Sequence, residues 1–108
     1  MQELLVRWRT AGGLDVDTEE LLVRQTLSYF AQLYPGRSVE IRVPWVSAVQ
    51  AISGVTHRRG TPPNIVELSA KAWLHLVVSG EVLTAEYSAS GSQSDITQYF
   101  PLFSELEN

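Results

Sequence analysis

One short segment of the sequence, HRRGTPPN at residues 57–64, gathers the side chains best suited to chemistry. His57 can act as an acid or a base near neutral pH, and Arg58 and Arg59 carry guanidinium groups that bind carboxylates or phosphates. The two prolines remove amide donors and restrict the residues before them, so the segment reads as a stiff connector. The pattern leaves two roles open for these arginines, anion binding or bracing of the loop. We expect Arg59 to bond main-chain carbonyls or Glu67, and Arg58 to face solvent.

The sequence contains no motif that is typical of a catalytic or metal-binding site. It has two histidines and no cysteine, and His57 and His75 lack the spacing of a helical metal pair. Residues 54–60 lack the Lys-Ser/Thr ending of a phosphate-binding loop, and neither G-x-S-x-G nor G-x-G-x-x-G occurs. We therefore expect no catalytic residue, no metal and no cofactor. An enzyme that uses His57 with a distant carboxylate is kept as a minority alternative.

Length and charge restrict the class of protein. The 108 residues fit one domain spanning residues 1–108. The net charge of −4 has the wrong sign for a general nucleic-acid-binding protein, whose affinity comes from neutralising phosphates. The absence of cysteine favours a reducing compartment, and the apolar run at residues 4–6 is too short for a secretory signal or a membrane span. We expect a cytoplasmic protein with no membrane span.

Hydrophobic periodicity predicts two amphipathic helices that would flank this segment. The first is expected to begin at Asp17, which has Glu20 at capping-box spacing, and to end before Pro35. The second is expected to follow Ser69 as its cap and to end at Gly80. The apolar stripes of the two helices comprise Val23, Leu27, Phe30 and Tyr34 in the first, and Ala70, Trp73, Leu74 and Val77 in the second.

Strict alternation predicts a strand at residues 38–43, SVEIRV. Its apolar side chains, which we expect to face the helices, are Val39, Ile41 and Val43. A turn or bulge at Pro44 and Trp45 should lead into a second, antiparallel strand at residues 46–53.

The remaining segments complete an α+β fold class. Residues 64–69 are expected to form a third strand, and residues 81–91 lean toward a strand at AEYSAS. Residues 96–100 should form a short helix that ends before a proline. Residues 104–108 are expected to be a frayed tail.

Several short runs together resemble the small sterol-carrier-like proteins of actinobacteria. These runs are PGRSVEIRVP at 35–44, AVQ at 48–50, HRRGTPPNIVE at 57–67, WL at 73–74, SG at 90–91 and DITQYFPL at 95–102. The resemblance covers residues 23–102, and residues 1–16 are then an N-terminal extension. It implies a mixed β-sheet of about five strands with helices packed on one face, and an apolar tunnel between these layers in the lipid-binding members.

The resemblance leads to two functional hypotheses. In the first, a non-enzymatic domain binds a small apolar or lipid-like ligand, such as a fatty acid or an isoprenoid, between sheet and helices. In the second, side chains fill this cleft, and the domain is an interaction or dimerisation module whose partner is a second copy or another protein. The wall residues of the first hypothesis are Val46, Ile52, Trp73, Val77 and Tyr87. The residues that would meet a polar head group are Gln50, Arg58 and Arg59.

Core packing competes with ligand binding for each of these apolar side chains. Empty space in a core destabilises a protein by about 24 cal/mol per Å³, so a large dry tunnel is disfavoured in a chain of this size. We expect a small pocket or none.

Overall fold

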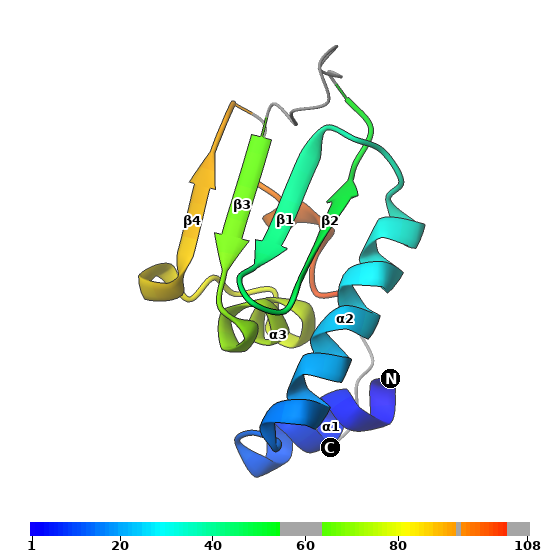
Figure 1. Ribbon diagram of the computed structural model, residues 1–108, viewed down its shortest axis with the longest axis vertical. Helices are drawn as coiled ribbons and strands as arrows, with labels where there is room; N and C mark the ends of the chain where they lie inside the picture. The colour runs from blue at the N-terminus through cyan, green and yellow to red at the C-terminus, as the bar shows by residue number, and fades with distance from the viewer. Residues whose placement is uncertain (55–63, 93, 104–108) are drawn as a thin grey trace.

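The computed structural model describes residues 1–54, 64–92 and 94–103 (Figure 1). The α-helices are α1 (Gln2–Ala11), α2 (Val16–Leu33) and α3 (Ala70–Ser79). The strands are β1 (Val39–Val43), β2 (Ser47–Ala51), β3 (Asn64–Leu68) and β4 (Tyr87–Ser90). Two 3₁₀ helices, η1 (Thr84–Glu86) and η2 (Thr97–Tyr99), flank β4 in the sequence.

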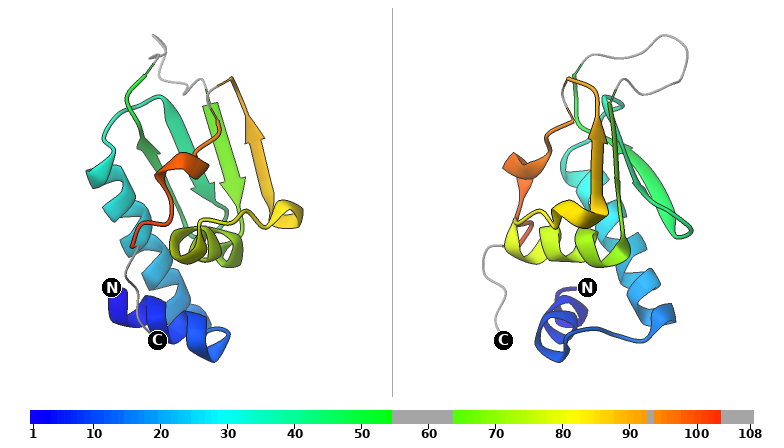
Figure 2. Two further views of the ribbon diagram at one scale, coloured as in Figure 1. Left: turned by 180° about the vertical axis from the view of Figure 1, so that it is seen from behind. Right: turned by 90° about the vertical axis from the view of Figure 1, so that its left-hand side faces the viewer.

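The strands form one mixed sheet in the order β2-β1-β3-β4, which confirms the predicted α+β fold class. β1 and β3 are parallel, whereas β1 with β2 and β3 with β4 are antiparallel. The described part of the chain contributes four strands, compared with the five or so implied by the resemblance. Seen from behind, η2 crosses the sheet and α3 lies across the lower strand ends (Figure 2), whereas none of the described helices covers the face of the sheet shown in Figure 1.

The predicted register of β1 is confirmed. Val39, Ile41 and Val43 are buried, while the alternating Glu40 and Arg42 are partly exposed. Because side chains on a strand alternate between faces, the buried set faces the helices and the charged pair faces the open side. The guanidinium of Arg42 pairs with the carboxylate of Glu40 on that open side.

One helix start was predicted correctly and the other was wrong. Ser69 caps α3, because its hydroxyl accepts a 3.0 Å hydrogen bond from the Ala72 amide. For α2 the cap is Asp15 and not Asp17: the Asp15 carboxylate accepts hydrogen bonds from the Thr18 amide (3.1 Å) and hydroxyl (2.8 Å). A carboxylate placed three residues before a free amide satisfies that donor, so the helix begins two residues earlier than the capping-box pattern indicated.

The structure places a helix, α1, in the first residues, where the sequence patterns predicted no element. Leu5 is fully buried and Trp8 nearly so, and α1 contacts both α2 and α3. The indole N–H of Trp8 donates a 3.0 Å hydrogen bond to the Glu19 carboxylate. Arginines stand on either side of Trp8, so the short apolar face of this helix does not appear as a clear helical pattern in the sequence.

The second strand, β2, is shorter than the predicted residues 46–53. Trp45 and Ile52 both have positive φ, 71° and 70°, and lie just beyond its two ends. A positive φ interrupts the extended backbone of a strand, so β2 is confined to Ser47–Ala51, between these two positions. The predicted strand at AEYSAS is confirmed as β4, and the predicted terminal helix is the single 3₁₀ turn η2. No helix in the described ranges is long and apolar enough to cross a membrane.

Candidate functional site

The space between α2, α3 and the C-terminal segment is filled by a cluster of aromatic rings. Phe30 stacks on Phe100 with ring centroids 5.1 Å apart, and it meets Trp73 edge to face at 6.0 Å. The Trp73 indole is completely buried, and its N–H donates a 2.8 Å hydrogen bond to the Thr26 hydroxyl. Val77 is also completely buried. Trp73 and Val77, two of the expected wall residues, therefore lie in packed core.

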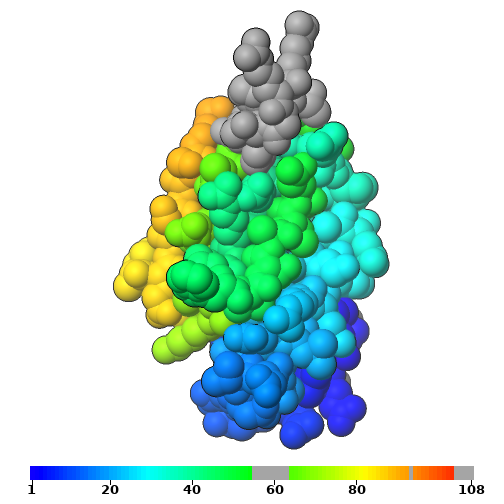
Figure 3. All heavy atoms as spheres, in the orientation of Figure 1, coloured from blue at the N-terminus to red at the C-terminus, as the bar shows by residue number. Residues whose placement is uncertain are grey.

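An open pocket of about 460 Å³ lies at the end of the sheet where the β1–β2 hairpin, the start of α3 and the η1–β4 segment meet. We call it the hairpin pocket. Its apolar lining comprises Pro44, Trp45, Val46, Leu68, Ala70, Ala85 and Tyr87. In Figure 3 the green hairpin lies beside the yellow segment that precedes β4. The structure thus places Val46 and Tyr87, two of the expected wall residues, in one pocket at the end of the sheet and not between the sheet and the helices.

The hairpin turn carries an unusual residue at its third position. The Val46 amide donates a 3.0 Å hydrogen bond to the Val43 carbonyl, so the turn has Pro44 second and Trp45 third. Proline followed by a residue with positive φ is the pattern of a type II turn, in which glycine or asparagine normally takes the third place. Here that place holds Trp45, with φ 71° and its side chain 100% exposed.

The α3 side of the hairpin pocket is held by hydrogen bonds between its polar residues. The Ser69 hydroxyl donates a 2.7 Å bond to the Glu86 carboxylate and accepts one from the Ala72 amide. The Ser69 amide also bonds the Glu86 carbonyl (3.2 Å), which fixes η1 against the first turn of α3. Next to this junction, burial raises the pKa of Tyr87 above its usual 10.0, and the charge of Asp95 raises it further.

The other expected ligand-contacting residues lie away from the hairpin pocket or outside the described residues. Gln50 accepts a 3.2 Å hydrogen bond from the Arg37 guanidinium. Ile52 borders a separate, more polar pocket of about 420 Å³, whose other lining residues are Ser38, Ser53, Ser92, Asp95, Gln98 and Tyr99. Arg58 and Arg59, together with the minority candidate His57, lie outside the residues that the structure describes.

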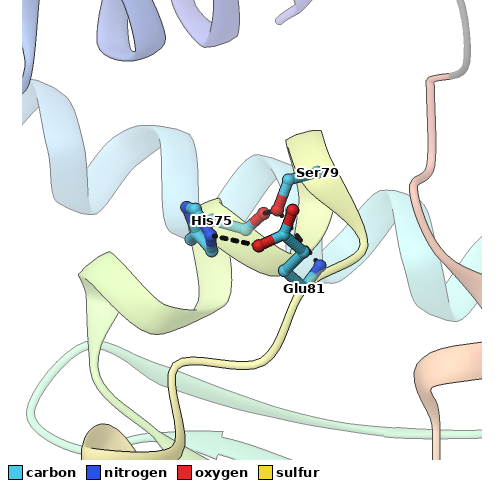
Figure 4. Close-up of polar contacts among 3 residues, drawn as sticks. All are labelled: His75, Ser79 and Glu81. Carbon is cyan, nitrogen blue, oxygen red and sulfur yellow. Dashed lines mark hydrogen bonds and ion pairs between the residues drawn. The ribbon is translucent and has the colours of Figure 1, made fainter.

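A serine, a histidine and a glutamate also lie together at the C-terminal end of α3 (Figure 4). Ser79 donates its hydroxyl hydrogen to the His75 main-chain carbonyl (2.6 Å), and its oxygen accepts from the Glu81 amide (3.1 Å). The His75 imidazole is 4.0 Å from the Glu81 carboxylate and makes no bond with the serine oxygen. This cluster therefore ends a helix and does not present an activated nucleophile. In the described ranges, no three His, Asp or Glu residues form a group that could hold a metal ion.

Three residues of the hairpin pocket were not predicted from the sequence to belong to a site: Trp45, Leu68 and Glu86. The available signal was the Pro44-Trp45 pair between two strand patterns, because a large aromatic residue is unusual at such a turn. Leu68 and Glu86 are far from the hairpin in the sequence. They line the pocket because the parallel pairing of β1 with β3 brings β3 and η1 beside the hairpin.

A family model described as "Bacterial SCP ortholog" matches residues 15–102 of the chain. The match contains every element that lines the hairpin pocket, whereas α1 lies outside it. No curated protein matches the chain.

Proposed function

This chain belongs to the bacterial SCP ortholog family, a sterol-carrier-like family, and we propose that it is a non-enzymatic domain that binds a small apolar or lipid-like ligand in the hairpin pocket. The observation that carries the proposal is the turn itself. A fully exposed Trp45 occupies a positive-φ position at the edge of an apolar pocket.

The conformation of Trp45 lowers the stability of the fold, and burial of its ring within the described chain does not offset this loss. A residue other than glycine in the left-handed region is strained by about 1–2 kcal/mol, and a ring that is fully exposed gains nothing from burial. Strained residues of this kind cluster at binding sites. A ligand that covered the ring would remove apolar surface from water, at about 25 cal/mol per Å².

The proposed site differs from the expected tunnel between sheet and helices. A ligand along Trp73 and Val77 would have to displace the Phe30 and Phe100 rings, whereas the hairpin pocket is open without rearrangement. Because the pocket is open to water, we expect a dissociation constant above about 1 μM. Cytoplasmic location and actinobacterial origin stay predictions of the sequence.

The proposal is tested by titrating 1-decanol into the ¹⁵N-labelled protein and following the amide shifts by NMR. Saturable shifts are expected at Val46, Leu68 and Tyr87. Trp45→Gly should weaken binding about tenfold, because it removes the ring while glycine accepts the same backbone conformation. The control is Val16→Ala, which trims a side chain that is 70% exposed and does not line the pocket. Shifts that centre on Trp73 and Val77, or an unchanged affinity in Trp45→Gly, would reject the site.

The filled interior around Phe30 favours a second candidate function, the interaction or dimerisation module. In that case Trp45 would be covered by a second copy of the chain or by another protein. Sedimentation velocity separates the two functions. A dimer that forms with rising protein concentration and is lost in Trp45→Gly supports the module, and a monomer that binds decanol supports the carrier.

A further inference from the structure

The charged side chains that line the hairpin pocket are all acidic among the described residues. Glu67 and Glu86 line it, and no described lysine, arginine or histidine does. Both glutamates are exposed and line the same open pocket as Trp45 and Tyr87.

Neither carboxylate is neutralised by an ion pair in the described part of the chain. Glu86 accepts only the neutral hydroxyl of Ser69, which positions it and leaves its charge in place. Glu67 lies beside Arg42 in the β1–β3 register, but that guanidinium pairs with Glu40. The pocket therefore combines an apolar and aromatic lining with two carboxylates that form no ion pair among the described residues, while Arg42 lines the adjoining pocket together with Trp45 and Glu67.

This combination determines the sign of the ligand charge that the pocket favours. A cation is attracted both by carboxylates and by the faces of tryptophan and tyrosine rings, which bind ammonium groups. A carboxylate or phosphate head group would meet two like charges in the same space. The net charge of −4 acts in the same direction on a ligand that approaches from solution.

From this geometry we infer that the ligand of the hairpin pocket is an amphiphile with a cationic head group, of the alkylammonium class. The apolar body packs on Val46, Leu68 and Ala70, and the head group lies between Glu67, Glu86 and the aromatic rings. The inference rests on the proposed function and narrows its ligand class. It differs in site from the expectation drawn from the sequence, in which Gln50, Arg58 and Arg59 meet a polar head group.

The test compares three probes with the same ten-carbon chain, each used below its micelle concentration: decyltrimethylammonium, 1-decanol and decanoate. Dissociation constants are measured by NMR titration at physiological ionic strength, where charges are screened beyond about 8 Å. The variants are Glu67→Gln, Glu86→Gln and the double variant. A glutamine at residue 86 still accepts the Ser69 hydrogen bond, so the junction with α3 is kept. Glu3→Gln is the control, because it changes the net charge equally on an exposed residue of α1 that does not line the pocket.

We expect wild-type protein to bind decyltrimethylammonium about tenfold more tightly than decanol, and decanoate more weakly than decanol. The double variant should remove this preference, while Glu3→Gln keeps it. Equal affinities for the cation and decanol, or an equal loss in Glu3→Gln, would overturn the inference and leave the carrier function standing. If no probe binds, the proposed function falls and the inference falls with it.

Discussion

The indole N–H of Trp73 donates a 2.8 Å hydrogen bond to the hydroxyl of Thr26, and both residues are completely buried. The same hydroxyl donates to the Leu22 carbonyl one turn earlier in α2. This pair joins α2 to α3 through a polar contact inside an apolar core, and it holds the tryptophan ring in the aromatic cluster around Phe30. Trp73 is thus fixed by its one polar atom as well as by packing.

The first prediction concerns this hydrogen bond. Thr26→Val keeps the shape of the side chain but leaves the Trp73 N–H without an acceptor, so we expect the free energy of unfolding to fall by about 1–3 kcal/mol. Thr26→Ser retains the hydroxyl and isolates the effect of the lost methyl group. Urea denaturation measures both. A valine variant as stable as the wild type would show that the bond contributes nothing.

The second prediction concerns the cap of α2 and its dependence on pH. Hydrogen bonds from the Thr18 hydroxyl and amide lower the pKa of Asp15 below its usual 3.8. The stabilising contribution of this carboxylate is therefore complete above pH 3.8 and is lost as the pH falls through the lower folded-state pKa.

Asp15→Asn should remove this part of the acid dependence while leaving a side chain that still caps the helix. Asp17→Asn, which alters a residue inside the first turn of α2, is the control. Thermal melts between pH 2 and pH 6 compare the variants. The assignment of the cap would be wrong if Asp17→Asn changed how the melting temperature falls at low pH and Asp15→Asn did not.

The third prediction separates stability from binding at the hairpin. Trp45→Gly relieves the strain of a positive φ, and it loses no packing because the ring is fully exposed. The gain of about 1–2 kcal/mol is partly offset by the backbone entropy of glycine, about 0.5–1 kcal/mol, so we expect a net gain of up to about 1.5 kcal/mol. Trp45→Ala keeps the strain and should not gain. A glycine variant that is less stable than the wild type would mean that the tryptophan ring packs in solution.

Local patterns predicted the elements well and the pocket poorly. The alternation of Val39, Ile41 and Val43 defined a buried strand face, and Ser69 marked a helix start, because each depends on residues close in sequence. The hairpin pocket instead joins Trp45, Leu68 and Tyr87 from three segments, and the sheet order that brings them together is not encoded in any local spacing. Trp73 was expected to line a cavity but is buried in the packed core. An apolar stripe on a helix does not distinguish these two roles.

The final prediction concerns the close approach of two chain segments beyond the other end of β2. Gly36 has φ 154°, and a Cβ atom at this residue would overlap the main-chain carbonyl of Ile52. That carbonyl cannot move freely, because it accepts a 3.0 Å hydrogen bond from the Ser38 amide while the Ile52 amide donates to the Tyr34 carbonyl. Two hydrogen bonds therefore hold the left-handed Ile52 against the glycine.

Gly36→Ala adds both backbone strain and a clash with fixed main chain, so we expect the free energy of unfolding to fall by about 2–5 kcal/mol. Gly13→Ala provides the matched control, because Gly13 has nearly the same φ, 151°, but a Cβ atom there would meet nothing within 4 Å. This control should lose only the strain, about 1–3 kcal/mol. Chemical denaturation of the two variants gives the difference, which measures the clash alone. Equal losses would show that the segment around Ile52 moves away at no cost, and that the two hydrogen bonds do not fix it.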